Sequence, residues 1–424
     1  MRILPLRRIW HAIGVCLTTS ALAATAHGQI APLSLEEALE LAAARSQQLV
    51  AEIAGATAAR ERAMAAGTRP DPVLITGIDN VPVEGPHERS LTRDFMTMRS
   101  IGIERELVGA AKRGAQTALY TREAEAADAA GSLALARLQQ QTAVAWFDRL
   151  FSDRATQLLV AQRASAAALV TAAELAYGNG TGTQSDVLAA RAAAARSDDA
   201  IAAAQRDVAL ARALLARWIG DDAAARPLAP PPRTDEVAVH HGNLEQELAS
   251  HPDLELMLKR EAVAVAEADI ARTQRRPNWT VGVSYQERGS AFDDMVSVNA
   301  SRPLRRSQRQ DRLLAASLAT AARARAEREE ETRAHLFEAH TLIETWASNR
   351  ARLERYATLL VPLAEQRVAA ATTAYRTGGG SLTDVIDART DVIDTQLEGL
   401  ALETETAKAW AELEYLIPDG ASSP

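Results

Sequence analysis

The sequence predicts a mainly α-helical protein with a small β part, built from two copies of one unit. The chain has 424 residues, and Ala and Leu carry most of its apolar content because aromatic residues make up only 4%. Small Ala side chains favour helix and let helices approach closely. The stretches Arg105 to Tyr177 and Arg305 to Tyr375 contain no proline except Pro362. About 70 helical residues make a rod of roughly 105 Å, which needs neighbouring helices along its length, as in a helical barrel.

The N-terminus predicts export from the cytoplasm. Three arginines precede an apolar run from residue 9 to 24, and Ala24-Thr25-Ala26 has the form of a cleavage site. We therefore expect residues 1–26 to be a secretory signal peptide. The single cysteine, Cys16, lies within it, so the mature chain is expected to carry no lipid anchor, disulfide or reactive thiol. No later stretch reaches the roughly 18 uncharged apolar residues of a membrane helix, so we expect membrane entry only through β-strands.

A Pro-rich break at residues 226–235, RPLAPPPRTD, divides the mature chain into two repeats. The first repeat is expected at 27–225 and the second at 236–420, followed by a short tail at 421–424. Each repeat reads in the same order: a helix, two strands, a very long helix, a Gly-rich turn and a final helix. The first helices, at 34–67 and 243–274, each end at an Arg-Pro step, which favours extended chain.

The strands are short and patterned. They are expected at residues 72–79, 95–104, 279–286 and 295–301. In WTVGVSYQ (279–286), apolar and polar residues alternate and an aromatic residue stands near each end, which is typical of a membrane-barrel strand. A half-buried strand of a soluble protein alternates in the same way, so both interpretations stay open here. Four strands cannot close a barrel, since closed barrels need about eight or more, so the barrel interpretation requires an oligomer.

One turn occurs twice, as YGNGTGTQSDVLAAR (177–191) and YRTGGGSLTDVIDAR (375–389). The glycines predict a helix stop and a reversal of the chain, so each turn joins two antiparallel helices at one end of the rod. Thr183 with Asp186, and Ser381 with Asp384, have the form of capping boxes that start the next helix. A phosphate-binding loop is rejected because the glycines follow a helix and no lysine comes after them.

Only the second copy continues into a train of acids. Their spacing of three and four residues places all of them on one helical face: Asp384, Asp387, Asp391, Asp394 and Glu398. Apolar residues occupy the opposite face: Leu382, Ile386, Ile393, Leu397 and Leu400. The acids are either an ordinary solvated face or the lining of a water-filled channel. Their presence in one repeat alone favours the channel, because the equivalent helix of the first repeat would pack elsewhere.

No catalytic, cofactor-binding or metal-binding constellation emerges, so we expect no enzyme. His240 and His241 are adjacent, and His335 and His340 are five apart, so neither pair has the i, i+4 spacing of helical metal ligands. Two methionines on one strand face, at positions 96 and 98, suit hydrophobic packing better than copper binding. The net charge of −8 offers no basic surface, so we expect no nucleic-acid partner.

The signal peptide, the duplicated units and the repeated turn together resemble a TolC-family outer-membrane efflux protein over essentially the whole mature chain. The segment ERELVGAAKRGAQ (104–116) is similar to one in the CzcC-like heavy-metal branch, and SRPLRRSQR (301–309) takes the corresponding place in the second repeat. The resemblance implies a TolC-like long α-helical barrel of coiled-coil hairpins. It also implies a homotrimer, in which four strands per chain form a 12-stranded β-barrel in the outer-membrane lipid of a Gram-negative bacterium.

The resemblance also implies the function of an exit duct that extends into the periplasm. Its partners would be a periplasmic adaptor (membrane fusion protein) and an inner-membrane RND-type pump, and its cargo heavy-metal cations. A duct for drugs or organic solvents is the close alternative. From a different class, a periplasmic adaptor or a secreted coiled-coil scaffold also stays open.

Site residues follow from the resemblance. Asp384 and Asp387 match the channel constriction, and Asp391, Asp394 and Glu398 would continue the lumen stripe. Tip closure and adaptor contact would involve Tyr177, Gly178, Gly180, Asp186, Tyr375, Arg376, Gly378 and Gly380. At the last of these positions the family often has Arg, so the chain departs from the pattern there, and Arg376 is the candidate replacement.

Overall fold

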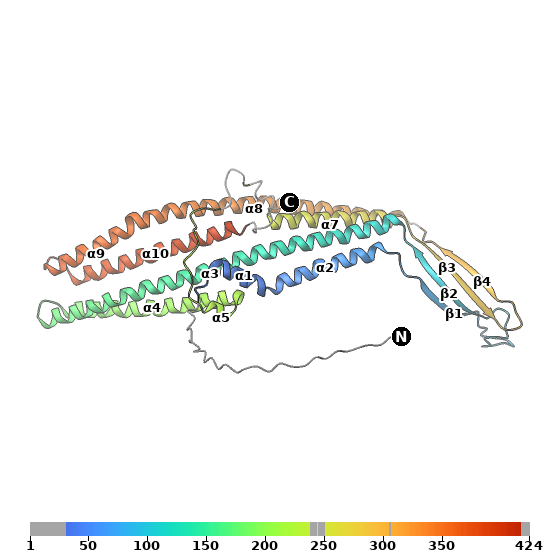
Figure 1. The fold of residues 1–424 in the computed structure, drawn as a ribbon, viewed down its shortest axis with the longest axis horizontal. Helices are drawn as coiled ribbons and strands as arrows, with labels where there is room; N and C mark the ends of the chain where they lie inside the picture. Colours follow the sequence, from blue (N-terminus) through green and yellow to red (C-terminus); the bar gives the residue numbers. More distant parts are fainter. Residues whose placement is uncertain (1–30, 238–243, 245–250, 305–306, 417–424) are drawn as a thin grey trace, which may run out of the picture.

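The computed structural model describes residues 31–237, 244, 251–304 and 307–416. The expected signal peptide, the pair His240 and His241, and the C-terminal tail lie outside these residues. The described chain is very elongated, with long helices at one end and a single small sheet at the other (Figure 1). This arrangement confirms the predicted fold class of a mainly helical protein with four strands.

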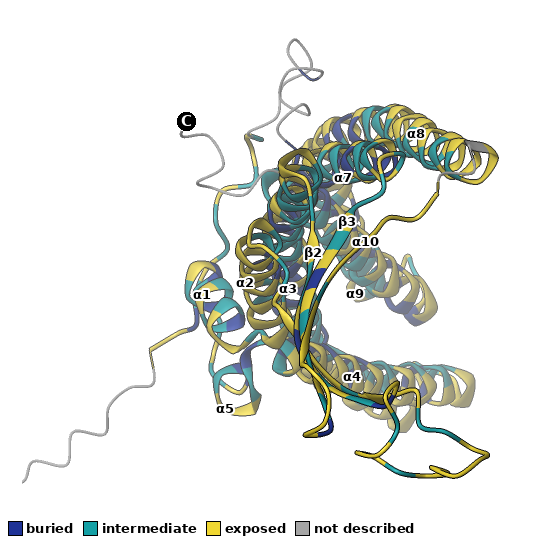
Figure 2. Cartoon of the chain, turned by 90° about the vertical axis from the view of Figure 1, so that its right-hand side faces the viewer, coloured by how far each residue is buried: buried dark blue, intermediate teal, exposed yellow. Residues whose placement is uncertain are grey.

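The helices come in two sets, one from each half of the chain. The first set is α1 (Leu35–Arg45), α2 (Gln47–Gly67), α3 (Ala110–Gly178), α4 (Gln184–Ile219) and α5 (Asp221–Ala224). The second set is α7 (Pro252–Gln274), α8 (Ser307–Arg355), η1 (Tyr356–Leu360), α9 (Val361–Arg376) and α10 (Leu382–Glu414). Seen from the sheet end, the helices form an arc rather than a closed bundle (Figure 2).

The helix expected at 34–67 is broken into two helices at Ser46. The Ser34 side chain accepts a hydrogen bond from the Glu37 N–H, and that of Ser46 accepts one from the Leu49 N–H. Ser46 has extended backbone angles and therefore ends α1 while it caps α2. Composition and period favour helix on both sides of this serine, so a single helix was the wrong expectation there.

The second long helix contains one turn of π-helix just before its proline. Pro362 lies in the first turn of α9 and has no backbone N–H, so one i→i−4 hydrogen bond cannot form. The chain accommodates this loss in the five residues of η1, which widen to i→i+5 bonding. The chain is therefore helical without a break from α8 to α9, as the nearly proline-free sequence predicts, but the five residues of η1 are π-helical instead of α-helical.

The strands form one antiparallel sheet in the order β1-β2-β3-β4. They are β1 (Val73–Asp79), β2 (Met98–Leu107), β3 (Trp279–Arg288) and β4 (Met295–Ser301). The strand pair of the first half and that of the second half join where β2 pairs with β3, for example Ile103 with Val283. Only β2 differs much from expectation, since it begins and ends three residues later than predicted.

The main hydrophobic core lies near the middle of the rod and combines both halves. Trp146, Phe147 and Trp410 are 0%, 0% and 6% exposed, and the Phe147 ring contacts both tryptophan rings edge-on. The Trp146 indole N–H donates to the carbonyl of Leu33, and that of Trp410 to the carbonyl of Glu236. These two hydrogen bonds attach the segments around Leu33 and Glu236 to the core helices.

One 18-residue window of α3 is long and apolar enough to cross a membrane by length and composition if up to two charged residues are allowed, whereas the expectation concerned uncharged stretches. Only 11% of that window is buried within the chain. The helix is rich in alanine, which raises its apolar content without bulky side chains. Most residues of this window, unlike the core residues Trp146 and Phe147 of the same helix, are therefore at least partly exposed in a single copy of the chain.

Candidate functional site

The two Gly-rich turns lie at the end of the rod far from the sheet (Figure 1). Their hydrogen bonds match position by position. The amides of Gly180 and Gly378 bond to the carbonyls of Tyr177 and Tyr375, at 3.1 Å in each turn. Both glycines have a positive φ, +73° and +79°, which residues with a side chain rarely adopt. The prediction of two equivalent helix reversals is confirmed.

Gly380 has a local steric reason to be glycine. A Cβ atom there would lie 3.0 Å from the Cβ of Ala374 and 3.3 Å from the amide nitrogen of Tyr375. Gly182 is the equivalent position of the first turn and would meet Ala176 at the same 3.0 Å. The turn itself therefore disfavours an arginine at position 380. Arg376 is exposed and makes no ion pair with the described residues.

Both predicted capping boxes are present. The Asp186 carboxylate accepts from the N–H and O–H groups of Thr183, and the Asp384 carboxylate accepts in the same way from Ser381, at 2.7–2.9 Å. These bonds lower the pKa of both carboxyl groups: for Asp186 chiefly the Thr183 hydroxyl, and for Asp384 chiefly the Ser381 N–H. The Asp384 carboxylate thus bonds to Ser381, the residue that caps the start of α10.

The acids of the α10 stripe are all exposed in the single chain, whereas the apolar residues on the opposite side of the helix are buried or partly buried. Asp387 and Asp394 make no hydrogen bond or ion pair with any described residue. Asp391 pairs with Arg367 of α9, and Glu398 accepts a hydrogen bond of 3.1 Å from the Tyr356 hydroxyl. On the opposite side, Leu382 and Ile386 are 2% and 6% exposed. The predicted division of this helix into an acidic and an apolar face is confirmed.

The apolar face of α10 packs on the hairpin of the first repeat. Near the tip, Leu382 and Ile386 form a cluster with Ala173, Val187 and Ala190 of α3 and α4. Tyr375 packs against this cluster, whereas its counterpart Tyr177 is 52% exposed. The two tips therefore lie side by side but are not interchangeable, because only the second one turns its tyrosine inward. The backbone of Gly178 begins the first turn and remains exposed.

At the other end of the molecule, one face of the sheet is apolar and uncovered. Its residues are 37–75% exposed: Leu74, Ile78, Ile101, Ile103, Leu107, Trp279, Val281, Val283, Tyr285, Val296 and Val298. The register places Ile103 beside both Leu74 and Val283, so the apolar rows continue across the strands. The opposite face is mostly small and polar in β2, β3 and β4, for example Ser284 paired with Ser297, but it also exposes Val73, Ile75 and Met295. Strands β1 and β4 each leave one edge unpaired within the chain.

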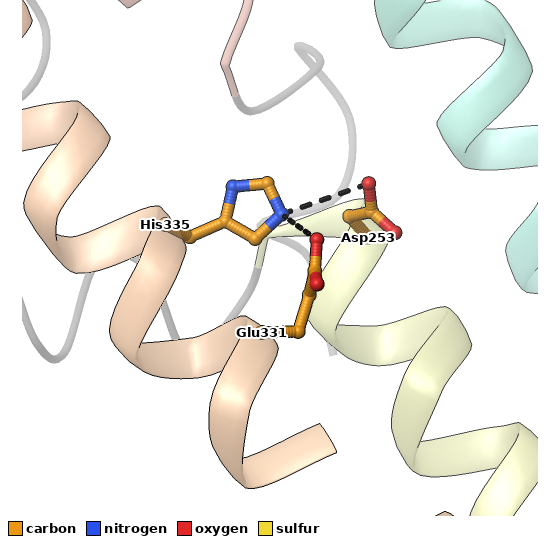
Figure 3. Close-up of side chains that lie close together, drawn as sticks. All are labelled: Asp253, Glu331 and His335. Atoms are coloured by element: carbon orange, nitrogen blue, oxygen red, sulfur yellow. Dashed lines mark ion pairs between the residues drawn. The ribbon is translucent and has the colours of Figure 1, made fainter. Parts of the chain in front are cut away.

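A third group of side chains lies where α7 begins, beside α8 (Figure 3). The Nε2 atom of His335 lies 3.4 Å from a Glu331 carboxylate oxygen and 3.6 Å from Oδ2 of Asp253. Asp253 also pairs with Arg137 of α3 at 2.7 Å. The neighbouring His251 ring lies 4.7 Å from the His335 ring and caps α7 through its Nδ1 atom.

Burial and charge shape the titration of this group. Interaction with His335 and with Arg137 lowers the pKa of Asp253, although burial opposes the shift. Interaction with Asp253 raises the pKa of His335. Burial, followed by the charge of His335, lowers the pKa of His251 to about 4. The spacing between histidines alone does not reveal this cluster, because its other two members are carboxylates. The i, i+4 pair Glu331 and His335 was the available signal.

Residues 243–417 match the family described as Outer membrane efflux protein. No curated protein matches the chain. Among solved structures, the chain is similar to the outer membrane protein VceC from Vibrio cholerae, with 21% identity and a TM-score of 0.75 over 90% of this chain and 95% of that one.

Two further solved structures are similar. The Campylobacter jejuni outer membrane channel CmeC has 12% identity and a TM-score of 0.77 over 92% of this chain and 87% of that one. The open state of the Neisseria gonorrhoeae MtrE outer membrane channel has 16% identity and a TM-score of 0.69 over 90% and 88%. The second half of this chain thus matches the outer membrane efflux protein family, and about 90% of the chain has the fold of these outer-membrane proteins.

Proposed function

We propose that three copies of this chain form the exit duct of a tripartite efflux system, without catalysis. The duct would sit in the outer membrane of a Gram-negative bacterium and extend into the periplasm. The observation that carries this proposal is the sheet, which has an exposed apolar face, a more polar opposite face and, among the described residues, two open edges. In water such a sheet would aggregate, whereas in lipid its apolar face is solvated and only its edges need partners.

Three copies would satisfy those edges. If β4 of one copy pairs with β1 of the next, the sheets join into a closed barrel of 12 strands, which leaves no unpaired edge. The uncovered apolar window of α3 supports the same assembly, since it offers surface for helices of neighbouring copies. A periplasmic adaptor with a single helical hairpin, or a secreted scaffold, needs neither the apolar sheet face nor two hairpins.

The other partners would meet the duct at its tip. The two turns would contact the periplasmic adaptor, which links the duct to an inner-membrane RND-type pump. The tip residues proposed for closure and adaptor contact are Tyr177, Gly178, Gly180, Asp186, Tyr375, Arg376, Gly378 and Gly380. Since a side chain at position 380 would be crowded by Ala374 and Tyr375, Arg376 is the nearby cation that would reach acids of another copy.

The acid stripe supports cations as cargo, and heavy-metal cations in particular. In a symmetric trimer, Asp384 and Asp387 would each form a ring of three carboxylates, with Asp391, Asp394 and Glu398 continuing the stripe. Rings of carboxylates in a narrow pore attract cations and repel anions. The segment 104–116, similar to the heavy-metal branch, points the same way. A drug-exporting duct remains the second candidate, favoured if the rings prove not to act on ions.

Ion selectivity in planar bilayers tests the channel and its acid rings. The structure makes Asp387 the better target, because Asp384 also caps its helix. A carboxylate about 10 Å from an ion contributes roughly 0.4 kcal/mol in water before screening, so three add about 1.2 kcal/mol. After screening, Asp387→Asn should lower the ratio of cation to anion permeability about fivefold in 0.1 M salt and about twentyfold in 0.01 M salt, because the ring attracts the cation and repels the anion. Asp384→Asn should add to this effect.

The matched control is Asp186→Asn, the equivalent cap in the first repeat, which has no neighbouring acid stripe. This change should leave selectivity unaltered. If Asp387→Asn and wild type have the same selectivity at both salt concentrations, the stripe is a solvated face and not a pore lining. If purified protein forms no conducting pore at all, the exit-duct proposal fails.

A further inference from the structure

We propose that Asp253, Glu331 and His335 bind a divalent transition-metal cation of the Zn²⁺ type, which clamps the start of α7 to α8. The side chains of all three residues converge (Figure 3), and their ligand atoms lie within 4.8 Å of one another. One imidazole nitrogen and two carboxylates are a donor set that suits Zn²⁺ and similar ions. The site would be structural and separate from the cargo path, so it does not depend on what the duct exports.

The spacing of the donor atoms fits a metal better than hydrogen bonding. His335 Nε2 lies 3.4 and 3.6 Å from the two carboxylate oxygens, beyond the 2.7–3.2 Å of ordinary N–H···O bonds. Ligands about 2.0–2.1 Å from a tetrahedral zinc ion lie about 3.3 Å from each other. A small rotation of each side chain would therefore bring all three atoms into one coordination sphere. Glu331 and His335 also have the i, i+4 spacing that places two ligands on one helical face.

The central nitrogen is buried and unsatisfied. His335 Nε2 has no hydrogen-bond partner in the described structure, and the His335 side chain is only 14% exposed. Such an atom is costly unless water, an ion or another group meets it. The other ring nitrogen, Nδ1, lies 3.6 Å from a Glu338 carboxylate oxygen. At that distance the two groups are not hydrogen-bonded, so Glu338 would have to move closer to orient the ring as outer carboxylates do at metal sites.

Local charge also favours a cation. Three carboxylates, those of Asp253, Glu331 and Glu338, surround the imidazole, while Arg137 is the cation paired with the first of them. The buried ring of His251 covers one side. These side chains line a cavity of about 320 Å³, which has room for a water molecule as the fourth ligand. The competing arrangement is a metal-free ion network in which His335 carries a proton.

Metal titration of the intact protein distinguishes these two arrangements. Detergent-solubilised, full-length protein would be stripped with chelator, dialysed, and titrated with Zn²⁺ by calorimetry, with Mg²⁺ for comparison. Co²⁺ would report the coordination geometry by its visible absorption. The variants Glu331→Gln and His335→Ala remove single ligands. Among the described residues Glu331 forms an ion pair only with His335, so its replacement should leave the fold intact. Circular dichroism checks that the helices are retained.

Two neighbours on α8 serve as controls. Glu330→Gln removes an exposed acid that pairs with Arg333, and His340→Ala removes an exposed histidine. We expect one Zn²⁺ per protomer, no comparable binding of Mg²⁺, and an intense tetrahedral Co²⁺ spectrum in wild type and both controls. Glu331→Gln and His335→Ala should weaken Zn²⁺ binding more than about tenfold.

Absence of saturable Zn²⁺ binding, or equal binding by the ligand variants and the controls, would overturn this inference and leave the metal-free network. That outcome would not touch the exit-duct proposal, because pore formation is measured separately in bilayers.

Discussion

At the residue scale, three consecutive glycines of the second tip have different physical requirements. Gly378 has φ +79°, a conformation that costs an L-residue roughly 1–2 kcal/mol. Gly380 lacks room, since an added Cβ would lie 3.0 Å from the Cβ of Ala374. Gly379 has neither constraint, because its nearest neighbour, the Ala374 carbonyl oxygen, would be 3.9 Å away. A run of identical residues therefore hides two necessary glycines and one that is free to change.

These differences predict a graded alanine series at the tip. Gly378→Ala should destabilise the turn locally by about 1–2 kcal/mol, and Gly380→Ala by about 1 kcal/mol. Gly379→Ala should be neutral or slightly stabilising, because it restricts the unfolded chain. Hydrogen exchange of the turn amides, followed by mass spectrometry, measures each effect in the assembled protein. Equal protection in the variants at 378 and 379 would contradict the backbone argument.

At the element scale, each helix after a tip begins with a reciprocal cap. In α10, the Asp384 N–H donates to the Ser381 hydroxyl oxygen at 3.1 Å, and the carboxylate accepts two bonds in return. The first repeat repeats this geometry with Thr183 and Asp186. Each cap satisfies backbone N–H groups at the start of its own helix, whereas the two hairpins contact each other near the tip through the apolar cluster around Leu382 and Ile386.

Removing the cap should loosen only the first turn of α10. Ser381→Ala should cost about 1 kcal/mol, which is roughly a fivefold loss of amide protection there. The folded-state pKa of Asp384 is lowered, so its contribution is present above the ordinary value of 3.8 and disappears as pH falls through the lower folded value. Protection of the first turn in wild type, corrected for intrinsic exchange rates, should therefore be the same at pH 7 and pH 5.

The comparison variant for the cap is Ser317→Ala, which removes a mid-helix hydroxyl bonded to the Leu313 carbonyl in α8. Its effect on the first turn of α10 should be nil. A loss of protection in wild type between pH 7 and pH 5 would show that Asp384 titrates in that range and that its assigned hydrogen bonds do not form.

At the scale of the whole molecule, the sheet and the tips lie at opposite ends of the rod (Figure 1). If the sheet spans the outer membrane, the β1–β2 loop faces the outside and both tips face the periplasm. The mature chain is expected to contain no cysteine, so introduced thiols can be labelled without background. This arrangement makes membrane topology directly measurable.

Labelling intact cells with a membrane-impermeant maleimide tests the orientation. Glu88→Cys, in the exposed β1–β2 loop, should be labelled from outside. Asn179→Cys and Thr377→Cys, at the two tips, should be labelled only after the outer membrane is permeabilised, and both should crosslink to the adaptor. Labelling of the tips in intact cells would reverse the topology and refute the duct.

The sequence by itself determined the elements whose signals are local. The scarcity of proline predicted the long helices, and the alternation of apolar and polar residues predicted β3. Glycines predicted the two turns, and a hydroxyl residue three positions before an aspartate predicted each cap. The spacing of the acids by three and four residues predicted that they share one helical face. These features depend on backbone freedom and on contacts within a few residues, so one chain segment suffices to predict them. The break at Ser46 and the π-turn before Pro362 were missed, because flanking composition favours regular helix in both places.

Only the tertiary structure decided what depends on distant segments meeting. It paired β2 with β3, packed the apolar face of α10 on the first hairpin, and turned Tyr375 but not Tyr177 inward. It also brought Asp253 of α7 close to Glu331 and His335 of α8, although Asp253 is far from both of them in the sequence. Such meetings depend on the packing of whole helices against each other, which residue spacing does not encode. The i, i+4 spacing of Glu331 and His335 can be recognised in the sequence, but the approach of Asp253 and the burial of the cluster cannot.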